Sequence, residues 1–223
     1  MKTIKPLVEK TKIASEVFNK LDITVINAVL HGMADALIEY QQIIIKLNDQ
    51  DVANGKAMRL SPLAMDRLLI NSERITAIAT SIRYLARSKA VIALKDDEHK
   101  NIASPSTLAI IYESRPHLTA EAACLAFRSG NSIVLRGGKE GFHSNTAISS
   151  ILCDVLEQNG LPRELITLLP TTDRVSITEL ISLKDLVDHV VIHGSEGLDH
   201  YVRKNTKIPI LNKLPEIQDA FNI

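Results

Sequence analysis

The chain has 223 residues, and its 26 lysines and arginines balance its 26 aspartates and glutamates to give a formal net charge of zero. This balance gives no basis for non-specific binding to nucleic acid or to an anionic membrane surface, so we expect neither as a partner. Hydrophobic residues make up 45% of the chain but aromatic residues only 4%, so the core must consist mainly of Ile, Leu, Val and Ala. That composition is typical of a parallel sheet covered by helices.

The predicted cellular location rests on two features of the sequence. No apolar run approaches the roughly 20 residues that a membrane-spanning helix needs, and Met1 to Pro6 has no apolar stretch typical of a signal peptide. We therefore expect a cytoplasmic protein in which Cys124 and Cys153 are reduced. Both cysteines fall within predicted helices, among Ala, Leu and Ile, so we interpret them as buried and unreactive thiols.

Residues 1–90 are predicted to be helical and to pack on the rest of the chain. Asp22 is expected to cap a helix over residues 23–40. Ser61 followed by Pro62 is typical of another helix start. The next helix carries one apolar stripe, formed by Ile75, Ile78, Ile82 and Leu85.

Strands and helices alternate over residues 108–211. The predicted strands cover residues 107–113, 132–135, 165–169, 188–193 and 207–211. The predicted helices between them cover residues 119–128, 143–158, 175–183 and 196–204, with Thr119 as the cap of the first. This alternation predicts an α/β fold, with N-terminal helices followed by a doubly wound, Rossmann-like parallel sheet. Residues 91–107 are expected to form an exposed excursion before the sheet.

Turn residues and charged residues gather where the predicted strands end. A strand that ends in glycines before a helix brings backbone N–H groups close to a phosphate. Because the carboxyl ends of parallel strands meet at one edge, we expect these residues to line one nucleotide site. The residues at these strand ends are Glu113, Ser114, Arg115, Arg136, Gly137, Gly138, Glu140, Gly194 and Ser195, and the family resemblance given next implies that they bind the cofactor.

Several runs of this sequence carry a family resemblance. They are Ile111 to Pro116, Val134 to Gly138, Gly160 to Pro162, Thr171 to Arg174 and Thr206 to Ile210. At these runs the chain resembles gamma-glutamyl phosphate reductase, also called glutamate-5-semialdehyde dehydrogenase, of the aldehyde dehydrogenase superfamily. The resemblance covers the cofactor-binding, N-terminal half of that family, and residues 212–223 are expected to be a tail foreign to it.

The resemblance implies a cofactor and a reaction. The family reduces gamma-glutamyl phosphate to glutamate 5-semialdehyde in proline biosynthesis, with NADPH as hydride donor and a cysteine thiolate as nucleophile. It places Arg136 beside the adenosine ribose, where an arginine fork suits the 2′-phosphate of NADPH. It places Gly194 and Ser195 near the pyrophosphate, where the family usually has an Arg-Gly-Gly loop.

The catalytic part of the family pattern is missing from this sequence. The family continues after its Thr-Lys-Ile-Pro strand into a Cys-His pair, whereas this chain reads Asn212 to Ile223 without a cysteine. The family also has Asn, aligned with the oxyanion-hole asparagine of aldehyde dehydrogenases, where this chain has His117. The histidines show no metal-ligand spacing. We therefore predict no catalytic residue and no metal site, and expect the chain to be inactive as a reductase by itself.

Three hypotheses remain open from the sequence. The first is a truncated or separately encoded NADP(H)-binding half of the reductase. The second is a non-enzymatic interaction or regulatory protein that keeps the fold without binding a cofactor. The third is a fragment that needs a separate catalytic chain. A homo-oligomer is a further possible partner arrangement, although the shortened hairpin near residues 88–107, which the resemblance implies is an oligomerisation element, puts the family's dimer in doubt.

Overall fold

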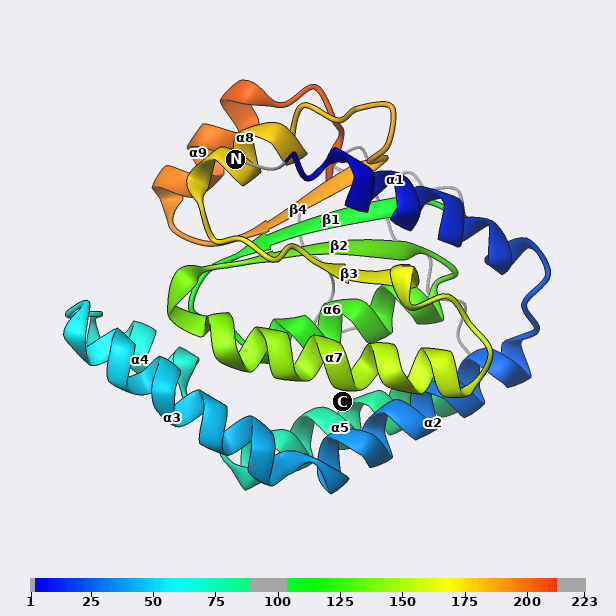
Figure 1. Ribbon diagram of the computed structural model, residues 1–223, viewed down its shortest axis with the longest axis horizontal. Coiled ribbons are helices and arrows are strands. Elements are labelled where there is room, and N and C mark those ends of the chain that lie inside the picture. Colours follow the sequence, from blue (N-terminus) through cyan, green and yellow to red (C-terminus); the bar gives the residue numbers. More distant parts are fainter. Residues whose placement is uncertain (1–2, 89–103, 212–223) are drawn as a thin grey trace.

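A five-stranded, all-parallel sheet forms the centre of the protein, in the order β3-β2-β1-β4-β5 (Figure 1). The computed structural model describes residues 3–88 and 104–211. The strands are β1 (Thr107–Tyr112), β2 (Ser132–Gly137), β3 (Ile166–Leu168), β4 (His189–His193) and β5 (Ile210–Leu211). The order reverses between β1 and β4, as in a doubly wound fold. The predicted α/β class and parallel sheet are therefore confirmed.

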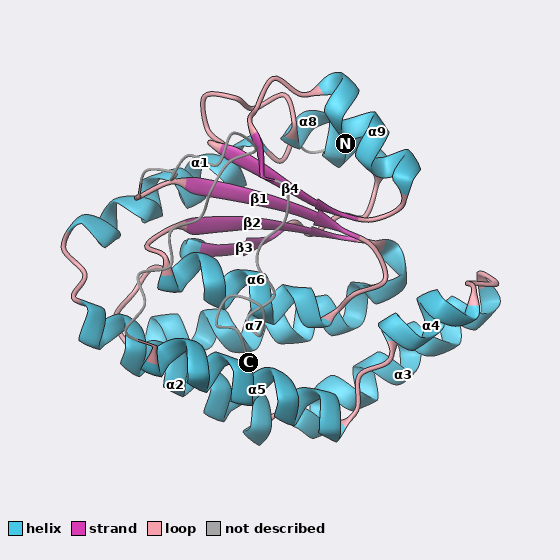
Figure 2. Ribbon diagram, turned by 180° about the vertical axis from the view of Figure 1, so that it is seen from behind, coloured by secondary structure: helices cyan, strands magenta, loops and turns pink. Residues whose placement is uncertain are grey.

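Helices cover both faces of the sheet, which lies between them in Figures 1 and 2. One face carries α1 (Lys5–Ala14), α8 (Arg174–Leu180) and α9 (Glu196–Asn205). The other face carries α6 (His117–Arg128) and α7 (Phe142–Gln158), with α2 (Ile23–Glu39) and α5 (Ser72–Arg87) packed behind them. Short 3₁₀ turns cover Ser15–Asn19, Lys139–Gly141 and Arg163–Leu165.

Two further helices, α3 (Gln41–Ala57) and α4 (Pro62–Leu68), extend away from the sheet at the left of Figure 1. None of the helices within residues 3–88 and 104–211 is both long and apolar enough to span a membrane. The excursion predicted at residues 91–107 falls mostly outside the described residues, as does the tail at 212–223. The proposed division of the chain into domains stays a prediction.

Every residue of β1 is buried, and successive side chains serve two different cores. Leu108 and Ile110 pack with the helices α2, α5, α6 and α7, whereas Ala109 and Ile111 pack with α1, α8 and α9. Successive side chains of a strand point to opposite faces of its sheet, so a strand buried on both faces must be apolar throughout. The continuous apolar run of the sequence thus reflects two cores that share one sheet.

The local signals for helix starts hold with one exception. The Asp22 carboxylate accepts a hydrogen bond from the backbone N–H of Thr24 and caps α2, and Ser61 caps α4 ahead of Pro62. The predicted cap at Thr119 is wrong, because α6 already begins at His117, directly after Pro116. Pro116 has a φ of −59°, which suits a helix start, so the helix cap lies three residues earlier than the Thr signal suggested. The apolar stripe predicted for α5 is buried as expected.

A buried polar contact attaches α3 to the start of α7. Asp51 has no exposed surface, and its carboxylate accepts hydrogen bonds from the backbone N–H groups of His143 and Ser144, at 3.1 and 2.8 Å. The Ser144 hydroxyl donates a third, at 2.6 Å, and also accepts one from the Asn48 side chain. Asp51 therefore supplies from another helix the acceptor that the first turn of α7 lacks in its own sequence.

Replacing Asp51 tests this contact. Asp51→Ala leaves one buried and one half-buried N–H group of α7 without their acceptor, so we expect the free energy of unfolding to fall by about 2–3 kcal/mol. Asp49→Ala is the matched control on the same helix, because Asp49 is exposed, and it should change stability by less than about 0.5 kcal/mol. Urea denaturation followed by circular dichroism measures both. Equal losses in the two variants would contradict the proposed role of Asp51.

Candidate functional site

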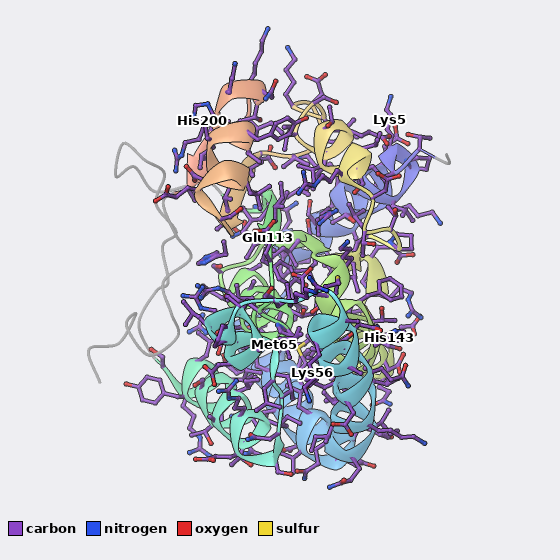
Figure 3. All side chains as sticks on the ribbon, turned by 90° about the vertical axis from the view of Figure 1, so that its left-hand side faces the viewer. Lys5, Lys56, Met65, Glu113, His143 and His200 are labelled. Carbon is purple, nitrogen blue, oxygen red and sulfur yellow. The ribbon has the colours of Figure 1, made fainter. Side chains whose placement is uncertain are left out.

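The carboxyl edge of the sheet brings three of the predicted loops together at the point where the strand order reverses. The loop after β1 begins at Glu113, the loop after β2 at Gly138, and the loop after β4 at Gly194. The backbone N–H of Glu113 donates to the carbonyl of His193 at 3.0 Å, which joins the β1 and β4 ends directly. Figure 3 looks onto this edge, with Glu113 near the middle of the view. Ligands of doubly wound folds bind in the crevice at such a reversal.

A groove of about 860 Å³ opens beside these loops, between α8 and α9. Its size is within the range of pockets that hold small molecules or cofactors. It is lined by Glu113, Arg136, Lys139, Thr172, Arg174, Val175, Ile177, Thr178, Ser195, Gly197, Leu198 and Tyr201. The side chains of Lys139 and Arg174 are exposed, as are those of Val175 and Tyr201. The groove therefore combines two solvent-accessible cations with apolar walls.

Glu113 reaches across the strand reversal to the start of α9. Its Oε2 atom accepts a hydrogen bond from the backbone N–H of Ser195 at 2.9 Å. A Cβ atom placed on Gly194 would lie 2.9 Å from the same oxygen, so the carboxylate rests against the glycine backbone. The absence of a side chain at Gly194 leaves room both for this carboxylate and for the Leu198 side chain, which a Cβ atom would approach to 2.5 Å.

Glu140 makes a similar contact with the loop after β1. Only 8% of its surface is exposed, and its carboxylate accepts hydrogen bonds from the backbone N–H and the hydroxyl of Ser114. Ser114 has a φ of 49°, a left-handed conformation that is uncommon for a residue with a side chain. A Cβ atom on Gly138 would collide with the Glu140 carboxylate. Two glutamates thus occupy the space beside two of the predicted phosphate-loop glycines.

Arg136 lies in the wall of the groove, but most of its hydrogen bonds go to the protein itself. Its guanidinium donates to the carbonyls of Thr172, Asp173 and Gly137 at 2.6, 3.2 and 3.1 Å, and its side chain is almost fully buried. Burial lowers the pKa of Arg136, while the nearby carboxylates of Glu140 and Glu113 raise it. The arginine therefore holds the loop before α8 through hydrogen bonds, and its positive charge interacts with the carboxylates of Glu140 and Glu113.

The remaining predicted residues belong to the same edge of the sheet. Gly137 ends β2 beside the Asn145 side chain, which leaves no space for a Cβ atom. Arg115 follows Ser114, and its charge acts on His117 at the start of α6. The structure thus brings all nine candidate residues to one edge, although only Glu113, Arg136 and Ser195 among them line the groove.

The groove also contains residues that the sequence did not single out for binding. They are Lys139 and Arg174, which supply the exposed positive charge, and Val175 and Tyr201, which supply apolar surface on α8 and α9. In the sequence, the run Thr171 to Arg174 indicates the family resemblance and gives no sign of a binding role. Only the packing of α8 beside α9 indicates that this motif faces the same space as Lys139.

His117 is half-buried in a positively charged environment. Burial, followed by the nearby charges of Arg115, Arg74 and His193, lowers the pKa of His117 to about 4. The imidazole is therefore neutral at physiological pH, and it stands where the family resemblance places an asparagine.

The two cysteines are buried, in agreement with the prediction. Cys124 lies on α6 near the sulfur of Met33, and burial raises its pKa. Burial also raises the pKa of Cys153 to about 11, and its thiol faces the carbonyl of Ile166 at 3.3 Å. A thiolate is the reactive form of cysteine, so neither residue is suited to nucleophilic attack. Among the described residues, no three His, Cys, Asp or Glu side chains gather as a metal ion would require.

Comparisons with known proteins agree with this geometry. No protein-family model matches the chain. It is 41% identical over 200 residues to a gamma-glutamyl phosphate reductase of Idiomarina loihiensis, an alignment that covers 83% of this chain and 46% of the relative. The crystal structure of the Thermotoga maritima gamma-glutamyl phosphate reductase superposes with a TM-score of 0.86 at 27% identity, over 95% of this chain and 53% of that protein.

More distant structures share only the fold. The NADP-dependent glyceraldehyde-3-phosphate dehydrogenase of Bacillus halodurans, solved with NADP, has a TM-score of 0.71 at 20% identity, over 93% of this chain and 43% of that protein. The fold is therefore an α/β fold shared with structures of the aldehyde dehydrogenase type. Within that type, the resemblance to gamma-glutamyl phosphate reductase is confirmed. The chain spans about half the length of the curated relatives it matches.

The state of His117 predicts a pH dependence of stability. Since its pKa is about 4 in the folded protein and about 6.5 in an unfolded chain, the unfolded state binds more protons between these values. Its contribution is complete above pH 6.5 and is lost as the pH falls towards 4, by up to about 3 kcal/mol. We expect His117→Asn to lose less unfolding free energy than the parent protein between pH 7 and pH 4.5, as measured by urea denaturation. Equal losses would show that His117 titrates normally in the fold.

Proposed function

We propose that the groove between α8 and α9 binds NADP(H), and that the chain acts as the nucleotide-binding part of a gamma-glutamyl phosphate reductase. The observation that carries this proposal is the meeting of two exposed cations and an apolar wall at the strand reversal of a Rossmann-like sheet. The fold relative from Bacillus halodurans, which was solved with NADP, supports the choice of cofactor. So do the relatives named gamma-glutamyl phosphate reductase.

The residues present fit the adenosine end of such a cofactor. Val175 is 56% exposed and Tyr201 is 40% exposed, so each offers apolar surface on which an adenine ring can pack. Gly197 has open space where a Cβ atom would stand, which leaves its backbone accessible within the groove. When bound, the cofactor would supply hydride chemistry at its nicotinamide end.

Lys139 and Arg174 are the residues that we assign to the 2′-phosphate. Both line the groove, and both side chains are exposed and available to a ligand. Arg136, predicted for this role from the sequence, lies close by and adds positive charge, but its hydrogen bonds to Thr172 and Asp173 commit it to shaping the loop. We therefore assign Arg136 a positioning role, and the two exposed cations the direct contact.

A second candidate function is that of an interaction protein that has kept the fold without the cofactor. One observation favours it: the carboxylates of Glu113 and Glu140 fill the space beside Gly194 and Gly138, where a phosphate-binding loop would present open backbone. The two candidates differ in whether the purified chain binds NADP⁺.

Cofactor titration tests the proposed groove. We expect NADP⁺ to bind more tightly than NAD⁺ by isothermal titration calorimetry. Lys139→Ala and Arg174→Ala should each weaken NADP⁺ binding about tenfold, or about 1.4 kcal/mol, and leave NAD⁺ binding nearly unchanged. Lys56→Ala is the matched control, since Lys56 is an exposed lysine of α3 that does not line the groove. Equal effects on both dinucleotides would remove the 2′-phosphate from the assignment, and the absence of NADP⁺ binding would favour the second candidate.

The reductase reaction should not proceed on this 223-residue polypeptide alone. The family chemistry needs an accessible thiolate, whereas both cysteines of this sequence are buried. We expect no NADPH formation from glutamate 5-semialdehyde, phosphate and NADP⁺, measured by absorbance at saturating cofactor. The Thermotoga maritima reductase is the positive control. If turnover occurs, a Cys124→Ser, Cys153→Ser double variant shows whether either thiol is responsible, and turnover itself would contradict the proposal.

A further inference from the structure

We infer that the Glu113 carboxylate occupies the anion-binding position at the start of α9. The pyrophosphate of a dinucleotide would have to displace this carboxylate from the backbone N–H of Ser195. This inference rests on the proposed nucleotide groove. It gives Glu113 the role of determining which part of the dinucleotide contributes most to binding. It makes the adenosine 2′-phosphate end the main determinant of affinity and the pyrophosphate end a weak contributor.

The contact has the geometry of a bound anion. The Glu113 carboxylate accepts the backbone N–H of Ser195 at 2.9 Å and lies against the backbone of Gly194. The Ser195 hydroxyl in turn accepts the N–H of Leu198, at 3.4 Å, as the helix cap. A phosphate at a helix start is held by the same kind of N–H donor and by the positive end of the helix dipole. The start of α9 thus already binds an anion, the carboxylate of Glu113, which follows the end of β1.

Other charges at this end of α9 act in the same direction. Glu196 and Asp199 both lie in the first turn of the helix. The Asp199 carboxylate accepts from Arg203 at 2.8 Å, so Glu113 and Glu196 contribute most of the negative charge at this helix start. A pyrophosphate with two negative charges must therefore lose favourable helix contacts to Glu113 and approach like charges. The positive charge of Lys139 and Arg174 comes from other elements of the groove wall, the η2 turn (Lys139–Gly141) and the start of α8.

This separation of charge has a specific consequence for ligands. A small ligand with a 2′-phosphate but no pyrophosphate, such as adenosine 2′-monophosphate, can meet the two cations without disturbing Glu113. NADP⁺ adds the pyrophosphate and with it the competition for Ser195. The affinity of adenosine 2′-monophosphate should therefore lie within about threefold of that of NADP⁺, a difference below about 0.7 kcal/mol.

The test is a charge-only substitution of Glu113. Glu113→Gln keeps the length of the side chain and an oxygen that can accept from Ser195, but removes the negative charge. We expect NADP⁺ to bind this variant at least fivefold more tightly than the parent chain, with adenosine 2′-monophosphate unchanged within about twofold, by calorimetry. Glu39→Gln is the matched control, because Glu39 is an exposed glutamate of α2 that does not line the groove and the substitution changes the net charge equally. It should raise NADP⁺ affinity by less than about twofold.

Each outcome decides the inference. Stronger NADP⁺ binding in Glu113→Gln alone supports it, including the case in which the parent chain shows no measurable binding. Unchanged NADP⁺ affinity in Glu113→Gln overturns it while the proposed groove stands. Equal gains in the two variants overturn it as well, since general electrostatics would then explain the effect. Lack of binding in all three proteins overturns both this inference and the proposed function.

Discussion

The parallel pairing of β1 with both β2 and β4 is the constraint on which the rest of the structure depends. Because β1 lies in the middle of the sheet, its side chains must be apolar on both faces, and two separate cores form around it. Because the strand order reverses beside it, the loops after β1 and β4 separate to opposite faces, and a crevice forms between them. The groove lies beside this edge, between α8 and α9 on one face of the sheet.

The polar groups at that opening are satisfied largely by the protein itself. Glu113 and Glu140 accept backbone N–H groups at the start of α9 and after β1, and Arg136 donates to carbonyls ahead of α8. Buried polar groups are costly without partners, so these contacts stabilise an edge that would otherwise expose unpaired backbone. The same contacts determine which charges remain available to a ligand, and these are at Lys139 and Arg174.

The long helices before the sheet also contact the elements that follow its strands. Asp51 on α3 caps the start of α7, which follows the β2 loop that carries Lys139. The helix α6 begins at His117 and is packed on α5 through the arginine Arg128, which donates to the carbonyl of Leu85. Segments distant in sequence thus hold the start of α7 and the end of α6. The start of α7 follows the turn that carries Lys139, so the position of the groove depends on α3 as well as on the sheet.

The sequence by itself determined the α/β class, the parallel sheet, most helix and strand positions and the family resemblance. Apolar runs, turn glycines and capping residues act over a few neighbouring positions, so they can be read from the chain directly. It also indicated the buried state of Cys124 and Cys153. Only the tertiary structure decided which charged side chains meet. Arg136 resembled a phosphate ligand until its carbonyl partners at Thr172 and Asp173 were known, and Glu113 showed no sign of reaching Ser195, 82 residues away. Such contacts depend on how loops from separate strands converge in space, and no local pattern encodes that convergence.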